Sequence, residues 1–250
     1  MRRARIQGET GLVIKLADIW VYLAAGPLLW LTATLAAYSL ADWISARLNR
    51  HPLVNPVVIA AGLIIGLLVA TDTGFATYFE GAQFVHFLLG PAIVALAVPL
   101  KRNLAKVRKS LVPIVAALVA GSATAVFSAV GIAWMLGAPA DVLASLAPKS
   151  VTAPIAMGLA ETLGGIPTLA AVMVVTTGIL GAMIVTPLMN WLRIRDYAAR
   201  GFAVGVASHG IGAARAFQVN ELAGTFAGIG MGLNGALTAF LVSVLAAVLV

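Results

Sequence analysis

The sequence has no cysteine among its 250 residues, and charged residues make up only 10% of it. The absence of cysteine excludes disulfides, thiolate metal sites and cysteine nucleophiles. A soluble domain carries about 25% charged residues, so this chain lacks the side chains that would cover a water-facing surface. Hydrophobic residues make up 61% of the chain, and its mean hydropathy is +1.02. The composition therefore predicts an integral membrane protein and excludes a soluble or nucleic-acid-binding one.

Histidine is also scarce, and its spacing is not that of a metal site. His51, His86 and His209 lie far apart in the sequence, and no HExxH-type motif occurs. A hydrolase using Ser208 and His209 is disfavoured, because adjacent residues rarely align a nucleophile with its base and no acidic third member is evident. We therefore expect no metal, no cofactor, no catalytic residue and no enzymatic activity.

Long apolar runs fill most of the chain. A membrane-spanning helix needs about 20 mostly apolar residues. Six continuous runs meet this requirement, at residues 19–46, 53–71, 84–100, 111–136, 166–192 and 222–250, and two broken runs lie at residues 142–163 and 202–219. We predict an all-α polytopic membrane protein with about eight membrane segments. Residues 19–250 are expected to form one transmembrane domain behind an N-terminal tail, residues 1–18.

Basic residues stand in short clusters between the apolar runs, and the formal net charge is +7. This spacing is typical of loops on the cytoplasmic side of a bacterial inner membrane, where they face anionic lipid rather than nucleic acid. The clusters at residues 101–109 and 193–200 should share that side. Two crossings, 111–136 and 166–192, already separate them. The segment around Lys149 must therefore enter and leave on one side as a re-entrant hairpin.

The N-terminus does not fit this topology. One crossing from Arg47 places the arginine-rich start of the chain outside, against the positive-inside rule. Two explanations stay open: the tail lies in the membrane interface, or Gly26 and Pro27 break the first span.

Three apolar segments contain residues that interrupt helices. Proline removes a backbone donor and clashes with the preceding turn, and glycine loses most freedom when held in a helix. Backbone freed at membrane depth is tolerated only where protein buries it or where it lines a cavity. The residues concerned are Gly90, Pro91, Pro148, Pro154, Gly210 and Gly212. Residues 87–100 and 145–159 also resemble each other weakly, and each precedes an intact helix. Paired broken helices are typical of secondary transporters built from repeats.

Lys149 is the most informative residue. It follows Pro148, and Ser150 and Thr152 stand beside it in an otherwise apolar stretch. Pro154 is placed to start a half-helix that Thr152 could cap. The free N–H groups of such a half-helix, together with a lysine, favour a carboxylate or phosphate. Alternatively, the lysine snorkels to the interface from a short loop. An ammonium group within the bilayer is costly, which favours a functional role.

A second polar group follows in the motif ASHGIGAARA. The two glycines after His209 should open the helix, Ser208 adds a hydroxyl group, and Arg215 is expected in the first turn of the resumed helix. An arginine at a helix N-terminus is tolerable if an anion lies between them. The alternatives are a packed histidine and an arginine that faces the headgroups. For Asn234 an interhelical hydrogen bond is the favoured role, and substrate contact is the alternative.

Together these motifs resemble the LrgB/CidB family of membrane proteins. The resemblance extends from about residue 55 to the C-terminus. It rests on FEGAQFVHFLLGPAIVALAVPL, LAPKSVTAPIAMG, GGIP, GILGA, RIRDYAARGFAVGVASHGIGAARA and MGLNG. The family resemblance implies an LrgA/CidA-like membrane partner, a homo-oligomer, or both. It also implies one of two roles: holin/antiholin-like control of murein hydrolase export and cell lysis, or transport of small carboxylates.

The PKSVT and SHGIG forms look closer to the branch that contains the plastidial glycolate/glycerate translocator, of which this chain resembles the LrgB-like part. We therefore expect an inverted-repeat carrier of small monocarboxylates of the glycolate, glycerate, pyruvate and lactate class. Lys149 and Arg215 would hold the carboxylate, and His209 would tune charge or carry a proton. The remaining candidate substrate contacts are Ser150, Thr152, Ser208 and Asn234. The alternative is the holin/antiholin-like regulator.

Overall fold

The computed structural model describes residues 26–95 and 97–249, and every regular element among them is helical. The predicted all-α class is therefore confirmed for these residues. The chain divides into two compact units, residues 1–94 and 95–250. The predicted N-terminal tail, residues 1–18, lies outside the described residues.

Four helices lie in the described part of the first unit, from residue 26 onward. They are α2 (Pro27–Arg47), α3 (Pro56–Ala70), α4 (Phe75–Phe87) and α5 (Leu89–Ala95). The helix α2 starts at Pro27 with Gly26 as its N-cap, and the two explanations for the N-terminus depend on residues outside the described ones. The helix α3 starts with a proline in its first position, and the Asn55 side chain accepts a 2.8 Å hydrogen bond from the Val57 amide. Both starts use proline where no helical hydrogen bond is lost.

The break expected at Gly90 and Pro91 lies slightly earlier in the chain. The helix α4 ends at Phe87, Leu88 forms a turn, and α5 resumes at Leu89. A proline ring clashes with the carbonyl group four residues before it, which for Pro91 is that of Phe87. Residues 84–100 are thus not one continuous helix, because the turn at Leu88 interrupts them.

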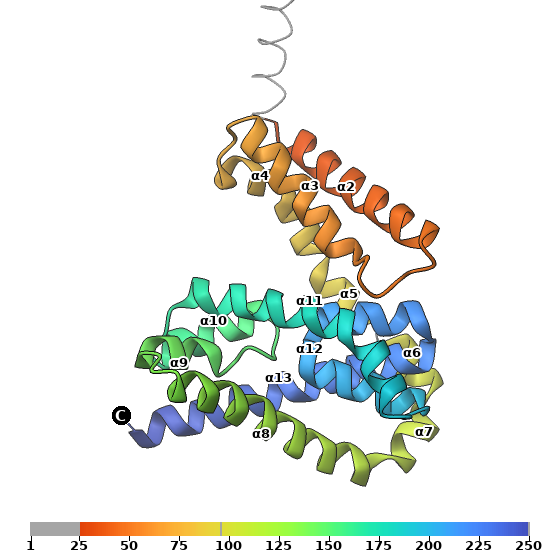
Figure 1. Cartoon of the computed structure of the whole chain (residues 1–250), viewed down its shortest axis with the longest axis vertical. Coiled ribbons are helices and arrows are strands. Elements are labelled where there is room, and N and C mark those ends of the chain that lie inside the picture. The colour runs from red at the N-terminus through yellow and green to blue at the C-terminus, as the bar shows by residue number, and fades with distance from the viewer. Residues whose placement is uncertain (1–25, 96, 250) are drawn as a thin grey trace, which may run out of the picture. The chain divides into compact units, whose positions relative to one another are not determined.

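The second unit holds the remaining helices (Figure 1). They are α6 (Ala97–Arg102), α7 (Leu104–Lys109), α8 (Leu111–Met135), α9 (Ala140–Leu146), α10 (Ala153–Thr162), α11 (Pro167–Trp191), α12 (Tyr197–Val219) and α13 (Glu221–Leu249). The helices α8 and α11 have 25 residues each. At 1.5 Å per residue each is about 37 Å long, which is enough to cross a hydrocarbon core of about 30 Å.

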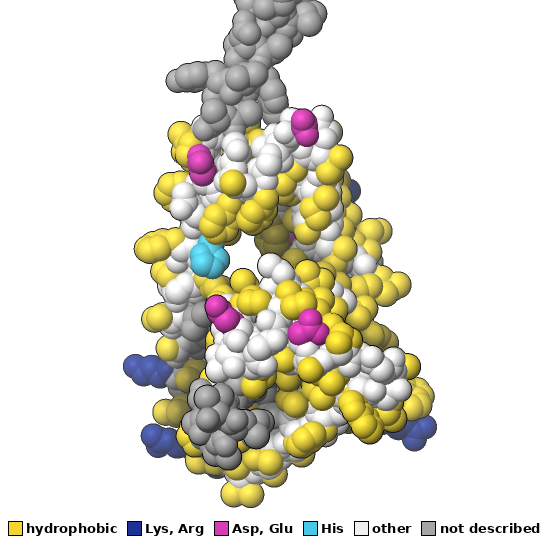
Figure 2. Space-filling model, turned by 90° about the vertical axis from the view of Figure 1, so that its left-hand side faces the viewer, with side chains coloured by type: hydrophobic (Ala, Val, Ile, Leu, Met, Phe, Trp, Pro, Cys, Tyr) yellow, Lys and Arg dark blue, Asp and Glu magenta, His cyan; other side chains and the backbone are white. Residues whose placement is uncertain are grey.

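By length and composition, three described helical stretches could span a membrane, at residues 111–135, 167–191 and 221–241. A fourth such stretch, residues 75–102, is interrupted by the turn at Leu88 and includes residue 96, which is not described. Large hydrophobic side chains such as Val112 and Leu136 are 81% and 82% exposed, and such side chains cover much of the face in Figure 2. A multi-pass membrane protein explains both observations, since lipid is then the solvent. The helix α3 has 15 residues and is shorter than a span. The count of about eight segments stays a prediction.

The two basic loops of the second unit lie at the same end of it. Lys106 Nζ, before α8, lies 4.0 Å from Asp196 Oδ2, which follows α11. The positive-inside argument placed both loops on one side, and the contact agrees with it.

Between α8 and α11 the chain forms a hairpin of two short helices, α9 and α10. They have 7 and 10 residues, or about 10 and 15 Å, so neither can cross the bilayer. Ser145 Oγ accepts a 2.7 Å hydrogen bond from the Ile166 amide at the start of α11 and donates one of 2.6 Å to the Asp141 carbonyl. The last turn of α9 is thereby tied to the start of α11, while the re-entrant path through the membrane stays a prediction.

The closest helix pair is α12 with α13. A Cβ atom on Gly201 would collide with the backbone of Ala223, and one on Gly205 would collide with that of Ala227. Small residues that let two backbones touch are the usual means of joining helices in lipid. The two glycines therefore set the position of α12 on α13.

Replacing Gly205 by valine should destabilise the second unit. The new side chain would overlap the Ala227 carbonyl group, and overpacking of this kind costs about 1–3 kcal/mol. We expect a lower thermal unfolding midpoint in detergent. Gly131→Val on α8 is the matched control, since a Cβ atom there meets nothing within 4 Å. Equal midpoints for the two variants would contradict the close α12–α13 contact.

Candidate functional site

The helix α12 is broken in its middle, within the SHGIG motif. Ser208 has φ −132° and ψ 17°, and His209 has φ 41° and ψ −134°. A positive φ is uncommon for a residue other than glycine and is often associated with a functional site. The interruption expected around Gly210 and Gly212 is thus present, one to two residues before the first of them. A Cβ atom on Gly212 would lie 2.9 Å from the Val204 carbonyl oxygen, so the fold around the break requires glycine there.

The helix α11 supports the break from the side. His209 is buried, and its Nε2 lies 2.9 Å from the Val174 carbonyl oxygen, to which the Nε2–H donates. A Cβ atom on Gly178 would come within 2.7 Å of His209 Cε1, and one on Gly181 would collide with Ser208 Oγ. Two glycines on one face of α11 therefore leave the space that the histidine and serine fill.

Asn234, on α13, joins three separate parts of the chain. Its Nδ2 donates to the Ser150 carbonyl at 3.1 Å and to the Val206 carbonyl at 3.2 Å, and its Oδ1 accepts from Ser122 Oγ on α8. The residue is 1% exposed. Val206 lies in the last turn before the break, where carbonyl groups lose helical partners. The favoured prediction for Asn234, an interhelical hydrogen bond, is confirmed, and substrate contact stays a prediction.

Lys149 lies in the turn between α9 and α10. Its Nζ donates a 3.3 Å hydrogen bond to Ser150 Oγ. The Lys149 side chain is half-buried. Ser150 is buried, and its carbonyl group is the one that Asn234 binds. The hairpin turn and the break in α12 therefore meet, although about 60 residues separate them in the sequence.

The half-helix expected after Lys149 is α10, and it differs from the expectation in one detail. Thr152 occupies the N-cap position with φ −69° and ψ 151°, and Pro154 is the second residue of the helix. The Thr152 side chain makes no capping hydrogen bond, so the prediction that it caps the helix is wrong. A proline in the first turn already removes one amide donor that a cap would satisfy. Pro148, before Lys149, is fully buried.

Arg215 does not lie where the sequence suggested. The helix resumes at Gly210, so Arg215 is the sixth residue after the break and lies in the second turn rather than the first. Its Nη1 donates a 3.4 Å hydrogen bond to Gln218 Oε1. It lines a pocket of about 20 Å³ together with Thr186 and Arg200. Asn234 thus joins the turn that carries Lys149 and Ser150 to the helix end beside His209, whereas Arg215 lines a small pocket that none of these residues lines.

Sequence reasoning missed Ser122 and the two glycines of α11. A serine in an apolar helix commonly bonds its own backbone, so nothing in the motif GSAT pointed to Asn234. The signal for the glycines was present, because Gly178 and Gly181 are three residues apart and share one helix face. Which helix that face would meet is a property of the tertiary structure.

The fold and the site together define a multi-pass α-helical membrane protein with a broken helix and a short-helix hairpin in contact. The sequence profile of the LrgB-like family matches residues 34–248, and the chain belongs to this family. The family resemblance read from the motifs is thereby confirmed. No solved structure matches the chain.

Several relatives align over most of the chain. The holin-like protein CidB of Staphylococcus epidermidis (strain RP62A) is 30% identical over 90% of this chain and 96% of its own length. The holin-like protein CidB of Staphylococcus aureus is 28% identical over 87% and 95%. The uncharacterized protein YxaC of Bacillus subtilis is 34% identical over 76% and 82%. The similarity to these bacterial relatives therefore covers between 76% and 90% of the chain.

Substituting Asn234 by leucine should destabilise the site strongly. The Ser150 and Val206 carbonyls and the Ser122 hydroxyl would lose their partner, and each buried unsatisfied group costs about 1–3 kcal/mol. Ser122→Ala removes one of the three bonds and should lower the thermal midpoint less. If both variants unfolded at the wild-type temperature in detergent, the amide would not hold these elements together.

Two substitutions of His209 separate the strain in its backbone from the contacts of its ring. Alanine and glycine both remove the hydrogen bond to Val174, but only glycine adopts φ 41° without strain. We expect His209→Gly to be more stable than His209→Ala by about 1 kcal/mol, the order of the left-handed penalty. Chemical denaturation in detergent measures the difference. The reverse order would show that the backbone at this position is not strained.

Proposed function

We propose that this chain has a holin-like role in a bacterial cytoplasmic membrane, as a regulator of murein hydrolase export and cell lysis. The observation that carries the proposal is the extent of the match to the holin-like CidB proteins. It reaches 90% of this chain and 96% of the relative from S. epidermidis. A likeness over nearly all of both chains includes the broken helix and the hairpin, so it is not confined to a shared hydrophobic segment.

The dimensions of the fold bear on how such a role is performed. A cavity of about 460 Å³ lies in the second unit, and a volume of this order holds a small molecule but not a folded enzyme. Passage of a protein would therefore require an assembly of several copies, or of this chain with an LrgA/CidA-like partner. Large exposed apolar side chains on the membrane helices, such as Val172 and Leu180, are available for such contacts.

A second candidate function is the transport of small monocarboxylates, and the surroundings of Lys149 favour it. An ammonium group beside the Ser150 hydroxyl, at a half-helix start, is chemically suited to a carboxylate. Ser150, Thr152 and Ser208 would bind a hydroxyl or keto oxygen, and His209 would tune the charge or carry a proton. Arg215 lines the separate small pocket. It would join Lys149 only after a movement of α12 of the kind that alternating access requires.

The two candidates are separated by one reconstitution experiment. The purified chain is placed in vesicles, with and without an LrgA/CidA-like partner. Release of an entrapped dye and of dextrans of graded size is measured beside uptake of labelled glycolate, glycerate, lactate and pyruvate. A holin-like assembly should release solutes according to size, without saturation. Saturable, stereoselective uptake without dextran release would replace the first proposal by the second.

Lys149→Gln is the informative variant in that assay. For a holin-like assembly we expect it to leave size-graded release unchanged, because a pore does not depend on one cationic group. For a carboxylate carrier it should abolish saturable uptake, since the charge that binds the anion is gone. Lys109→Gln is the control, because it removes an equal charge from the end of α7, beside the loop before α8. If Lys149→Gln left saturable uptake unchanged, the assignment of Lys149 to the carboxylate would be wrong.

A further inference from the structure

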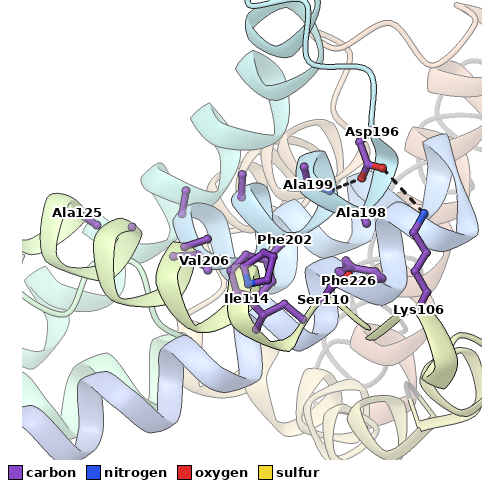
Figure 3. A pocket seen from close by; sticks show the side chains of 15 residues that line it. Lys106, Ser110, Ile114, Ala125, Asp196, Ala198, Ala199, Phe202, Val206 and Phe226 are labelled. Atoms are coloured by element: carbon purple, nitrogen blue, oxygen red, sulfur yellow. Dashed lines mark hydrogen bonds and ion pairs between the residues drawn. The ribbon is translucent and has the colours of Figure 1, made fainter. Parts of the chain in front are cut away.

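The cavity of about 460 Å³ is a groove between α8 and α12, with Phe226 of α13 contributing to its lining. Figure 3 shows its lining side chains along α8, from Ser110 at one end to Ala125 at the other. The lining is largely apolar, and Ile114, Phe202 and Val206 are buried there. Of the residues that line the groove, Val206 alone bonds Asn234, through its backbone carbonyl, and none bonds Lys149.

The length of the groove matches one leaflet of a bilayer. Ser110 and Ala125 are 15 residues apart on a single helix, which corresponds to about 22 Å. Half of a bilayer of about 40–45 Å, headgroup regions included, is about 20–22 Å. The exposed residues of its wall on α12 all have short side chains: Ala199, Ala203 and Ala207. The groove is therefore open to the surrounding lipid along its side.

One end of the groove is charged. Lys106 and Asp196 line it, 4.0 Å apart, and both side chains are exposed. The basic residues around this end outnumber the acidic ones: Lys101, Arg102, Lys106, Arg108 and Lys109 stand against Asp196 and Glu221. An exposed ion pair contributes little, so a stronger anion can displace Asp196 from Lys106. A basic cluster at a membrane surface attracts anionic headgroups.

The other end lies beside the broken helix. Val206 and Ala207 line the groove and directly precede Ser208 and His209. Discontinuous helices of membrane proteins typically lie near the bilayer midplane. An acyl chain that enters at the basic end and follows the groove would therefore run from the membrane surface to the midplane, as a lipid tail does.

We propose that this groove binds an anionic phospholipid, with one acyl chain along α8 and α12 and the phosphate on Lys106. A partner helix fits the groove less well, because a helix with its side chains is about 10–12 Å across and would rest on the rim of a 460 Å³ groove. The inference does not depend on which proposed function is correct. It requires only that the chain lies in a bilayer.

The test is lipid retention by the purified full chain, measured by native mass spectrometry. Phosphatidylglycerol and phosphatidylcholine with identical acyl chains are offered in equal amounts. The wild type should retain phosphatidylglycerol in preference. Ala203→Trp fills the groove and should lose bound lipid, whereas Val172→Trp, at a 57% exposed position of α11 outside the groove, should retain it. Lys106→Gln should still retain lipid but lose the preference for the anionic headgroup.

A second filling variant keeps the test decisive if the tryptophan prevents folding. Ala117→Leu adds a smaller side chain to the α8 wall and should lower lipid retention in part. Equal retention by wild type, Ala117→Leu and Ala203→Trp would overturn the proposal. So would a wild type that does not distinguish the two headgroups. Loss of self-association in Ala203→Trp, with lipid retention intact, would show instead that the groove binds a second copy of the chain.

Discussion

Where a helix is interrupted inside a membrane, its freed carbonyl groups need hydrogen-bond donors. In this protein the side-chain amide of Asn234 is such a donor. Lipid offers no hydrogen bonds to freed carbonyl groups. The amide binds the Val206 carbonyl beside the break in α12 and the Ser150 carbonyl before α10, and it accepts from Ser122 on α8. The hairpin, the broken helix and α8 are thereby held on α13. The turn that carries Lys149 and the helix end that precedes His209 are joined as a consequence of this contact.

The helix packing around Asn234 depends on residues that lack a side chain. Gly201 and Gly205 let α12 lie against the backbone of α13, and Gly178 and Gly181 give His209 and Ser208 their space on α11. Helices in lipid gain little from hydrophobic burial, because lipid tails are as apolar as their side chains. Close approach of the backbones and interhelical hydrogen bonds hold the helices together instead. The break in α12 is therefore enclosed by contacts on two sides, and its positive φ at His209 is held by them.

The same fold leaves two distinct features available for function. One is the group of polar residues at the hairpin turn and the break, Lys149, Ser150 and His209, which the carrier proposal assigns to a small anion. The other is the apolar groove between α8 and α12, which begins at a basic surface and ends beside the break. A holin-like regulator would sense or alter the bilayer, and a lipid in contact with the broken helix would connect the bilayer to it. A carrier would bind its substrate at the polar residues, and the groove would then hold lipid without taking part in transport.

The sequence by itself determined the properties that depend on composition and on local backbone chemistry. The scarcity of charge required a membrane protein, long apolar runs required helices, and the PKSVTAP and SHGIG motifs marked a hairpin and a break that the structure contains. Local chemistry also explains why the first break lies at Leu88, since a proline acts on the carbonyl four residues earlier. Only the tertiary structure decided which polar groups meet. Asn234 binds partners 28, 84 and 112 residues away. Arg215 lines a separate small pocket, because a helix turns about 100° per residue and six residues after His209 it presents a different face. Contacts between residues so far apart in the sequence depend on how the helices pack, and no local sequence pattern predicts that packing.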